Sequence, residues 1–275
     1  MERVSRRDGA PAEARPAPSA AALDAALDAA QADALSAVAD GTDARFSVAV
    51  LDTGSAARAV YGADAYDTAS IVKVDILAAL LLRAQDAGRE LTAQERSHAA
   101  VMIERSDNDA ATALWREIGG AEGLDAANER LGLTDTYGGA SGRWGLTRTT
   151  AADQLTLLRQ IFTEGPHVFT DGQAGGEAAL GERSRAYIRR LMGQVVPEQA
   201  WGVSAAADDP ALTRLKNGWL PRTATGLWDV NSIGQVTAKG RTYLVAVLSD
   251  GHPDKDSGVA VVERAARAAL GVALS

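Results

Sequence analysis

Ser70 and Lys73 stand three residues apart at the start of a strongly apolar segment. In a helix, residues at this spacing lie on one face, with their β-carbons about 5–6 Å apart. A serine hydroxyl attacks poorly until a base removes its proton, and a lysine can be that base once burial lowers its pKa from about 10.4. We therefore expect a buried Lys73 within hydrogen-bonding reach of Ser70, with Ser70 as the nucleophile of an acyl transfer.

The tripeptide Ser106-Asp107-Asn108 falls between two expected helices and supplies a second set of polar groups. The hydroxyl of Ser106 can relay a proton toward a leaving nitrogen, and the amide of Asn108 can hold a substrate carbonyl or the lysine. Asp107 is better explained as the residue that orders this loop. We expect Ser106 to take part in catalysis and Asn108 in substrate binding.

A third tripeptide, Lys216-Asn217-Gly218, lies in an expected strand. Its lysine is a cation for a substrate carboxylate or for proton relay, and its glycine lets a substrate come close to the backbone. The backbone N–H groups of Ser70 and Trp219 would form an oxyanion hole, in which one donor contributes about 3–4 kcal/mol in other hydrolases. Lys216 is thus a catalytic candidate, and the expected substrate contacts are Asn108, Asn217, Gly218, Trp219 and Arg222.

Each of the three signals has an ordinary structural explanation when it is taken alone. A serine three residues before a lysine is, by roughly ten to one, an N-cap followed by a surface lysine. The Ser-Asp-Asn tripeptide is usually a capping turn, and Lys-Asn-Gly is usually a hairpin turn. All three in this order, each in a suitable element, match the motif set of class A β-lactamases and penicillin-binding proteins.

The resemblance to this family extends over roughly residues 20–272. The segments that carry it are FSVAVLDTGS at 46–55, YDTASIVKVDILAALLL at 66–82, SDNDAATALWREIGGAEGLDAANERLGL at 106–133, TRTTAADQLTLLRQIF at 147–162 and WDVNSIGQVTAKGRTYLVAVLSD at 228–250. It implies an acyl-ester on Ser70, no cofactor, and a small-molecule β-lactam, peptide or ester as substrate. A β-lactamase-like hydrolase is favoured. A D-alanyl peptidase, an esterase, a transacylase, or a β-lactam or peptide binding protein that stalls after acylation, stays open.

The sequence departs from the family at two places. Asn217 stands where the family usually has Thr or Ser, which removes a hydroxyl contact to a substrate carboxylate. The family also carries a glutamate that activates the deacylating water, on a loop that corresponds here to residues 131–149. This segment is short and has no glutamate, and Asp135 is its only acid. We therefore expect a long-lived acyl-enzyme and slow turnover of β-lactams.

Hydrophobic periodicity predicts the elements that position these residues. Helices are expected at 19–39, from Ser70 onward, in five segments between 92 and 192, and at 259–270; strands are expected at 46–51, 59–61, 213–216, 226–236 and 241–249. The fold class is α/β in its α+β, three-layer form: a mainly antiparallel sheet flanked by helices, with an inserted all-helical subdomain, as in β-lactamases and transpeptidases. The expected division is a flexible tail at 1–18, an α/β sheet subdomain at 19–69 plus 210–275, and a helical subdomain at 70–209.

A cleft between the sheet and the helical insert is the expected place for the site. Trp144, Trp219 and Trp228 are candidates for lining it, although a core or rim position fits each of them equally well. The acidic and basic run at 254–256 is expected to be a solvated turn.

Composition excludes several function classes. The formal net charge is −8, with basic residues scattered among acids, which argues against nucleic acid as a partner. The chain has no cysteine, so a disulfide, a thiolate nucleophile and a cysteine-ligated zinc are excluded. His98, His167 and His252 lack metal spacing, and we expect surface or structural roles for them and no metal site.

The N-terminal segment has basic residues but no apolar run after them, so neither a signal peptide nor a membrane segment is expected. Location stays open on this basis. The resemblance suggests a secreted or cell-envelope protein if a leader was removed, and otherwise a cytoplasmic one. We expect the protein to be a monomer.

Overall fold

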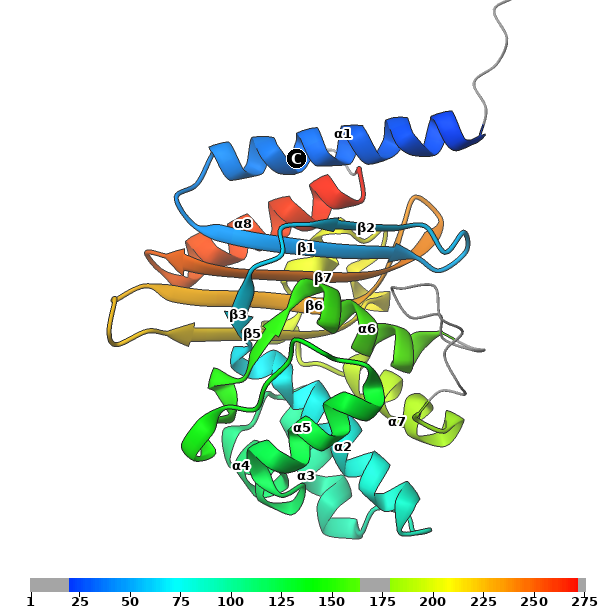
Figure 1. Cartoon of the computed structure of the whole chain (residues 1–275), viewed down its shortest axis with the longest axis vertical. Coiled ribbons are helices and arrows are strands. Elements are labelled where there is room, and N and C mark those ends of the chain that lie inside the picture. The colour runs from blue at the N-terminus through cyan, green and yellow to red at the C-terminus, as the bar shows by residue number, and fades with distance from the viewer. Residues whose placement is uncertain (1–19, 164–178, 272–275) are drawn as a thin grey trace, which may run out of the picture.

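A five-stranded antiparallel sheet forms the centre of the molecule (Figure 1). The structure is a computed structural model that describes residues 20–163 and 179–271, so the expected tail at 1–18 lies outside the described residues. The strand order is β2-β1-β7-β6-β5, with β1 at Arg45–Asp52, β2 at Arg58–Tyr61, β5 at Arg214–Pro221, β6 at Trp228–Ala238 and β7 at Arg241–His252. The N-terminal and C-terminal strands therefore share one sheet, and the predicted fold class is confirmed.

Helices cover both faces of this sheet. The face on which α1 (Ala20–Asp40) and α8 (Lys255–Ala269) pack receives Val48 and Val50 of β1, whereas Ala49 and Leu51 point into the core on the other side. This alternation follows from the two-residue period of a strand, and it explains why β1 is apolar at nearly every position. The helix expected from residue 259 begins at Lys255, because the side chain of Asp254 caps it by accepting the N–H of Ser257 at 2.7 Å.

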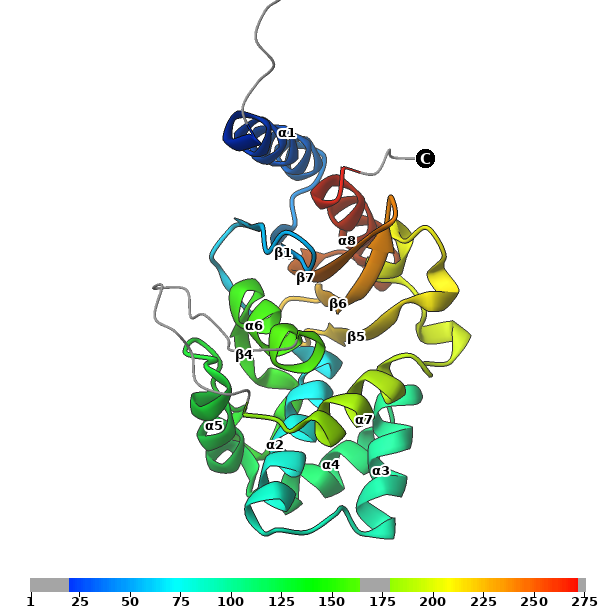
Figure 2. The same ribbon diagram turned by 90° about the vertical axis from the view of Figure 1, so that its right-hand side faces the viewer.

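The helical block lies on the opposite side of the sheet from α1, as both views show (Figures 1 and 2). It contains α2 (Val72–Asp86), α3 (Ala93–Glu104), α4 (Asn108–Glu117), α5 (Gly120–Leu131), α6 (Ala151–Phe162) and α7 (Glu182–Met192). Twelve of the fifteen residues of α2 are buried, so this helix is the axis around which the others pack. An apolar surface nearly all round is what a central helix requires.

A second, two-stranded sheet was not predicted from the sequence. β3 (Ala65–Asp67) pairs antiparallel with β4 (Arg148–Thr150), with Tyr66 opposite Thr149. Five short 3-10 helices follow η1 (Ala69–Ile71): η2 (Ala140–Gly142), η3 (Trp144–Leu146), η4 (Pro197–Gln199), η5 (Gly202–Ala206) and η6 (Pro210–Leu212). The small sheet ties the residues just before Ser70 to the end of the segment that carries η3.

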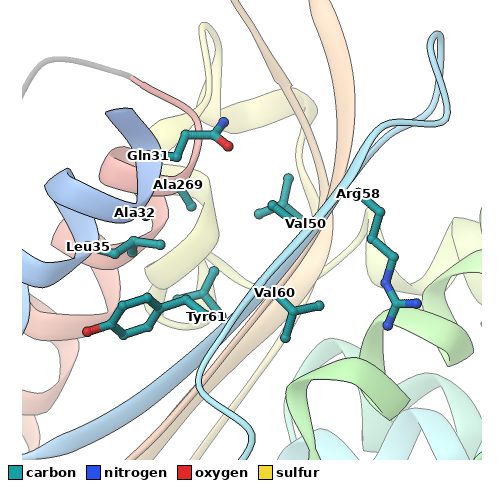
Figure 3. A pocket seen from close by; sticks show the side chains of 10 residues that line it. Gln31, Ala32, Leu35, Val50, Arg58, Val60, Tyr61 and Ala269 are labelled. Atoms are coloured by element: carbon teal, nitrogen blue, oxygen red, sulfur yellow. The ribbon is translucent and has the colours of Figure 1, made fainter. Parts of the chain in front are cut away.

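A cavity of about 250 Å³ lies between α1, α8 and the β1–β2 edge of the sheet (Figure 3), and Ser70 is not among the residues that line it. Leu35, Val50 and Tyr61 are among the side chains around it, and Arg58 extends from the opposite side of β2, away from the two helices. The lining is mostly apolar, and its polar residues Gln31 and Arg58 come from opposite sides, so we treat this cavity as a packing gap. Among the described residues, no helix is long and apolar enough to cross a membrane.

Candidate active site

Ser70 lies in η1, immediately before α2, and the sheet fixes its position. The side-chain amide of Asn231, on β6, donates to the backbone oxygens of Asp67 at 2.9 Å and Thr68 at 3.0 Å. Asn231 is fully buried, so these bonds are shielded from water. Ala69 has a φ of 47°, a left-handed conformation that costs a non-glycine residue free energy and that clusters at functional sites.

Lys73 is fully buried, one turn beyond Ser70. Its ammonium group donates to three oxygens: the carbonyl of Ser106 at 2.6 Å, the hydroxyl of Ser106 at 3.0 Å and the side-chain oxygen of Asn108 at 2.8 Å. The burial is as predicted, but the expected hydrogen bond to Ser70 is not among the contacts that the structure gives Lys73. The reason is physical: an ammonium has three donors, and three oxygens from the α3–α4 connection satisfy them all.

The hydroxyl of Ser106 joins two lysines. Lys216 on β5 donates to this hydroxyl at 3.0 Å, the same distance as Lys73, and to its neighbour Asn217 through the backbone oxygen at 2.9 Å. Ser106 has a φ of 58°, which turns its carbonyl and its hydroxyl toward Lys73. Asp107 caps α4 by accepting the N–H of Ala110 at 2.8 Å, so it orders the loop as predicted.

Burial makes both amines easy to deprotonate. Desolvation lowers the pKa of Lys73 to about 7, against the weaker opposing effect of the Asp107 carboxylate. The pKa of Lys216 is lowered well below its ordinary value, first by burial and then by the positive charge of Lys73. One of the two lysines can therefore be neutral near neutral pH and accept a proton, while the hydroxyl of Ser106 connects them.

Strand β5 runs against the backbone of Ser70, and Gly218 allows this contact. A β-carbon at Gly218 would lie 2.7 Å from the Ser70 nitrogen and 2.8 Å from the Thr68 oxygen, closer than real β-carbons come. Glycine is therefore required here by the approach of two backbones. Trp219 follows on the same strand, which brings its backbone to the rim of the site.

Asn217 is predicted to contact the substrate, but the structure places its side chain elsewhere. Its side chain is fully buried and donates to the backbone oxygens of Gln199 at 2.8 Å and Trp201 at 2.9 Å. Successive residues of a strand point to opposite faces, so Asn217 is turned away from the side on which Lys216 and Gly218 meet η1. The side chain of Asn217 holds the segment before η5 rather than facing a substrate.

A pocket of about 590 Å³ opens beside Ser70. Its walls come from the segment around η3 and from the end of β5 with the turn that follows; the lining residues are Ala69, Ser70, Asn108, Arg143, Trp144, Gly145, Leu146, Trp219, Leu220, Pro221, Arg222, Thr223 and Ala224. Trp144 and Trp219 thus line the pocket, whereas Trp228 packs against the core that α8 covers. Lys73 and Lys216 lie behind this lining.

Arg222 reaches the pocket but is engaged in ion pairs. It pairs with Asp67, and with Asp229 at 3.5 Å, while Arg148 pairs with the other oxygen of Asp67 at 3.4 Å. Burial raises the pKa of Asp229 to about 7, against the opposing effect of the Arg222 charge. An incoming carboxylate would therefore compete with Asp67 for Arg222.

One group at the site escaped prediction, and a second was predicted only to line the cleft. Asn231 gave no signal, because an isolated asparagine inside a strand does not reveal which loop its amide will hold. The indole of Trp144 lies over the Lys73 ammonium, with 4.9 Å between the nitrogen and the ring centroid, and donates to the hydroxyl of Thr112 at 3.2 Å. The only acid of the 131–149 segment, Asp135, is exposed and is not part of the pocket lining.

The comparisons with known proteins agree on the fold. A TLA-3 extended-spectrum β-lactamase has a TM-score of 0.74 at 14% identity, covering 88% of this chain and 97% of that one. A class A β-lactamase from Bacteroides cellulosilyticus has a TM-score of 0.71 at 18% identity, covering 88% and 96%. A PBP-A mutant, in an acyl-enzyme complex with penicillin G, has a TM-score of 0.69 at 21% identity, covering 87% and 94%. At such identities the likeness shows the fold alone.

Sequence comparison gives a family and a distant relative. "Putative lipoprotein LppW", from Mycobacterium tuberculosis and Mycobacterium bovis, is 36% identical over 114 residues, which is 41% of this chain. The match spans only 36% of the length of these relatives. The profile of the Beta-lactamase enzyme family matches residues 86–273, a range that includes Ser106 and Lys216 and begins after Ser70 and Lys73. Because this range is more than half of the chain, the protein belongs to the Beta-lactamase enzyme family.

Proposed function

We propose that this protein is a serine hydrolase that opens β-lactams by forming an acyl-enzyme on Ser70 and releases the product slowly. Family membership and fold support a hydrolase of β-lactamase or penicillin-binding type with a small-molecule substrate. The geometry of the site supports Ser70 as the nucleophile and a slow release of the product.

The observation that carries the proposal is the pair of buried lysines on one hydroxyl. Lys73 and Lys216 each lie 3.0 Å from the Ser106 hydroxyl, directly behind the pocket that Ser70 lines. Burying two amines side by side costs free energy, because desolvation penalises each charge and the two charges repel, and both effects favour the neutral form of one amine. Perturbed amines beside a cleft are candidates for acid–base work.

The proposed acylation is a balanced exchange of bonds. Neutral Lys73 takes the proton of Ser70 as the serine oxygen bonds to the carbonyl carbon of the substrate. The carbon–nitrogen bond of the cyclic amide breaks, and the leaving nitrogen receives a proton from the Ser106 hydroxyl, which Lys73 and Lys216 replenish. Asn108 holds Lys73, and the backbone N–H groups of Ser70 and Trp219 are proposed to bind the oxyanion.

Lys73 must first turn from the oxygens that hold it. This step is short, because Ser70 and Lys73 belong to adjacent turns of one helical segment.

Release of the product requires another step, since a water molecule must be held at the ester and lose its proton. Asp135 is exposed and outside the pocket lining, and no other acid is among the residues of that lining. This arrangement supports slow deacylation.

A fluorescent penicillin tests the acylation directly. The parent protein should carry a covalent label on a denaturing gel, Ser70→Ala should carry none, and Lys73→Ala should label about 10²–10⁴-fold more slowly. Lys239→Ala, which removes an amine that donates to the backbone oxygen of Gly271, is the matched control and should label at the parental rate. Parental labelling of Lys73→Ala would show that another group is the base.

We further propose that the protein works as a monomer in the cell envelope. The single chain supplies every residue of the proposed site, and the relatives named as lipoproteins support an envelope location. Fractionating cells that express the intact gene, and measuring the protein's mass in solution by light scattering, would test the two statements separately. A cytoplasmic product or a stable dimer would contradict them.

A further inference from the structure

Trp144 covers the face of Lys73 that its hydrogen bonds leave free. The three donors of the ammonium point to oxygens of Ser106 and Asn108, and the indole ring lies over the nitrogen at 4.9 Å. An ammonium over an aromatic face is stabilised by the ring electrons, and a ring in that position also occupies the space that a water would need. The three oxygens and the indole ring therefore separate Lys73 from bulk water.

The indole is held in this place by a built contact. Its N–H donates to the hydroxyl of Thr112 at 3.2 Å, and Thr112 in turn donates to the backbone oxygen of Asn108 at 2.9 Å. Asn108 is itself a ligand of Lys73, so ring and amine are positioned by the first turn of the same helix, α4.

The segment that carries Trp144 is anchored on both sides of the ring. The backbone oxygen of Thr147 accepts the N–H of Thr68 at 2.9 Å, and its hydroxyl accepts the N–H of Gly139 at 3.1 Å. Thr147 is fully buried, and β4 pairs with β3 immediately afterwards. The ring thus sits on a fixed support rather than at a free loop tip.

We propose that Trp144 is a positioning residue that excludes water from Lys73 and so sets the lifetime of the acyl-enzyme. This inference rests on the proposed function and adds a cause to it. In the acyl-enzyme, hydrolysis requires a water oxygen to bond to the ester carbon, the bond to the Ser70 oxygen to break, and the water proton to pass through Lys73 to that oxygen. With the indole in place, Lys73 has no room to receive the water. An acceptor that is itself a good nucleophile needs no such base and can enter through the open side of the pocket.

The test is the decay of a penicillin G adduct, followed by intact mass after free penicillin is removed. Trp144→Ala should hydrolyse its adduct about tenfold faster than the parent, a fraction of the 10²–10⁴-fold that a positioned base contributes. Trp144→Phe keeps a ring over the amine and should stay within about threefold of the parent. Tyr137→Ala is the matched control, since it removes an aromatic residue of the same segment. Tyr137 is 60% exposed, and the adduct of this variant should decay at the parental rate.

A second readout separates water exclusion from general damage to the site. Hydroxylamine added to the adduct releases the acyl group as a hydroxamate, forming a carbon–nitrogen bond as the serine ester breaks. Its rate should be about equal in the parent and Trp144→Ala, whereas a distorted site would change both release rates. The accelerated hydrolysis of Trp144→Ala should also increase between about pH 6 and pH 8, because a neutral Lys73 is required.

The outcomes distinguish the inference from the function beneath it. If Trp144→Ala acylates and its adduct decays at the parental rate, the inference is overturned while the acyl-enzyme stands. If the parent forms no adduct, the proposed function fails and the inference fails with it. Should Trp144→Ala not fold, Thr112→Val keeps the ring but removes its hydrogen bond; faster hydrolysis supports the inference, and an unchanged rate overturns it.

Discussion

At the scale of single residues, the proposed chemistry depends on a lysine that is held by a serine and an asparagine. Lys73 is buried among Ser106, Asn108 and Trp144, and its pKa is lowered to about 7. An amine accepts a proton only in its neutral form, so the fraction of enzyme with an active base increases as the pH rises through the pKa of Lys73.

We therefore expect the rate of labelling by penicillin to rise with pH and to level off above about pH 8. Measuring the second-order rate of labelling from pH 5 to 9 checks this, with the parent's thermal unfolding followed at each pH to exclude loss of fold. A rate that is flat across this range would mean that Lys73 is not the titrating base.

Asn217 gives a second prediction at this scale. Its amide holds two backbone oxygens, of Gln199 and Trp201, in the buried interior. Asn217→Thr installs the residue type that the family usually carries, but loses these bonds and leaves two buried oxygens without a donor. We expect the free energy of unfolding to fall by about 1–3 kcal/mol, with no gain in the rate of labelling by an anionic penicillin. Urea unfolding and labelling kinetics measure the two effects; faster labelling would show that residue 217 does face the substrate.

At the scale of elements, the site depends on the contact between β5 and η1. Gly218→Ala would place a β-carbon against the backbone of Ser70 and Thr68, which no side-chain rotation can relieve. We expect the strand to shift, labelling to fall by about 10²-fold because a small displacement of a reacting group is costly, and stability to fall by about 1–3 kcal/mol. Gly41→Ala is the control, since its nearest contact would be an ordinary 3.5 Å. An active Gly218→Ala would mean that the two backbones are not tightly apposed.

Helix α2 carries a buried acid as well as the lysine. Asp75 is fully buried, its carboxyl accepts a hydrogen bond from Gln154 at 3.2 Å, and burial raises its pKa to about 7. In the unfolded chain the same carboxyl ionises near 3.8. Between these values the folded protein keeps a proton that the unfolded chain has lost, so stability falls as the pH rises from about 4 to about 7, and the loss persists above it.

Asp75→Asn should remove this dependence. Relative to the parent, we expect a gain at pH 8 of up to about 4 kcal/mol, and a much smaller change near pH 5. Urea unfolding of both proteins at the two pH values measures the difference. An effect of equal size at both would show that Asp75 is ionised in the folded protein throughout.

Most elements could be predicted because they are long and periodic. The apolar runs of β1 and α2 identify buried elements, and every helix expected between 92 and 192 is present with ends shifted by a few residues. β3 and β4 have three residues each, which is too short for a period to be visible. The expected turn at 254–256 is instead the capped start of α8, because a charged run and a helix cap use the same residues.

The candidate site could be predicted in its residue types but not in its contacts. Short motifs predict the catalytic candidates, and the fold brings these candidates to one place: Ser70, Lys73, Ser106 and Lys216. Which oxygen holds Lys73 depends on the φ of 58° at Ser106, and the turn of Asn217 depends on the register of β5. Trp144 is expected from the sequence only as one of three residues that could line the cleft, since nothing in its neighbourhood indicates that its ring will cover an amine 71 positions earlier in the chain.

At the scale of the whole molecule, two cores hold a sheet and a helical block on either side of one pocket. The proposed acylation draws on groups from both: Ser70 and Lys73 from the central helical segment, Ser106 from the helical block and Lys216 from the sheet. For the proposed release, no acid lies in the pocket lining, and an indole lies over Lys73. We therefore expect an efficient acylation step and an obstructed deacylation step.

The most direct test of this separation is a time course of penicillin G with the parent protein, following the loss of the intact β-lactam ring in solution and the intact mass of the chain together. We predict that one β-lactam ring per chain opens in a burst, that the mass of the chain increases by one penicillin, that the adduct maps to the peptide containing Ser70, and that a slow phase of ring opening follows. Fast hydrolysis without a burst, or an adduct on any other residue, would contradict this prediction.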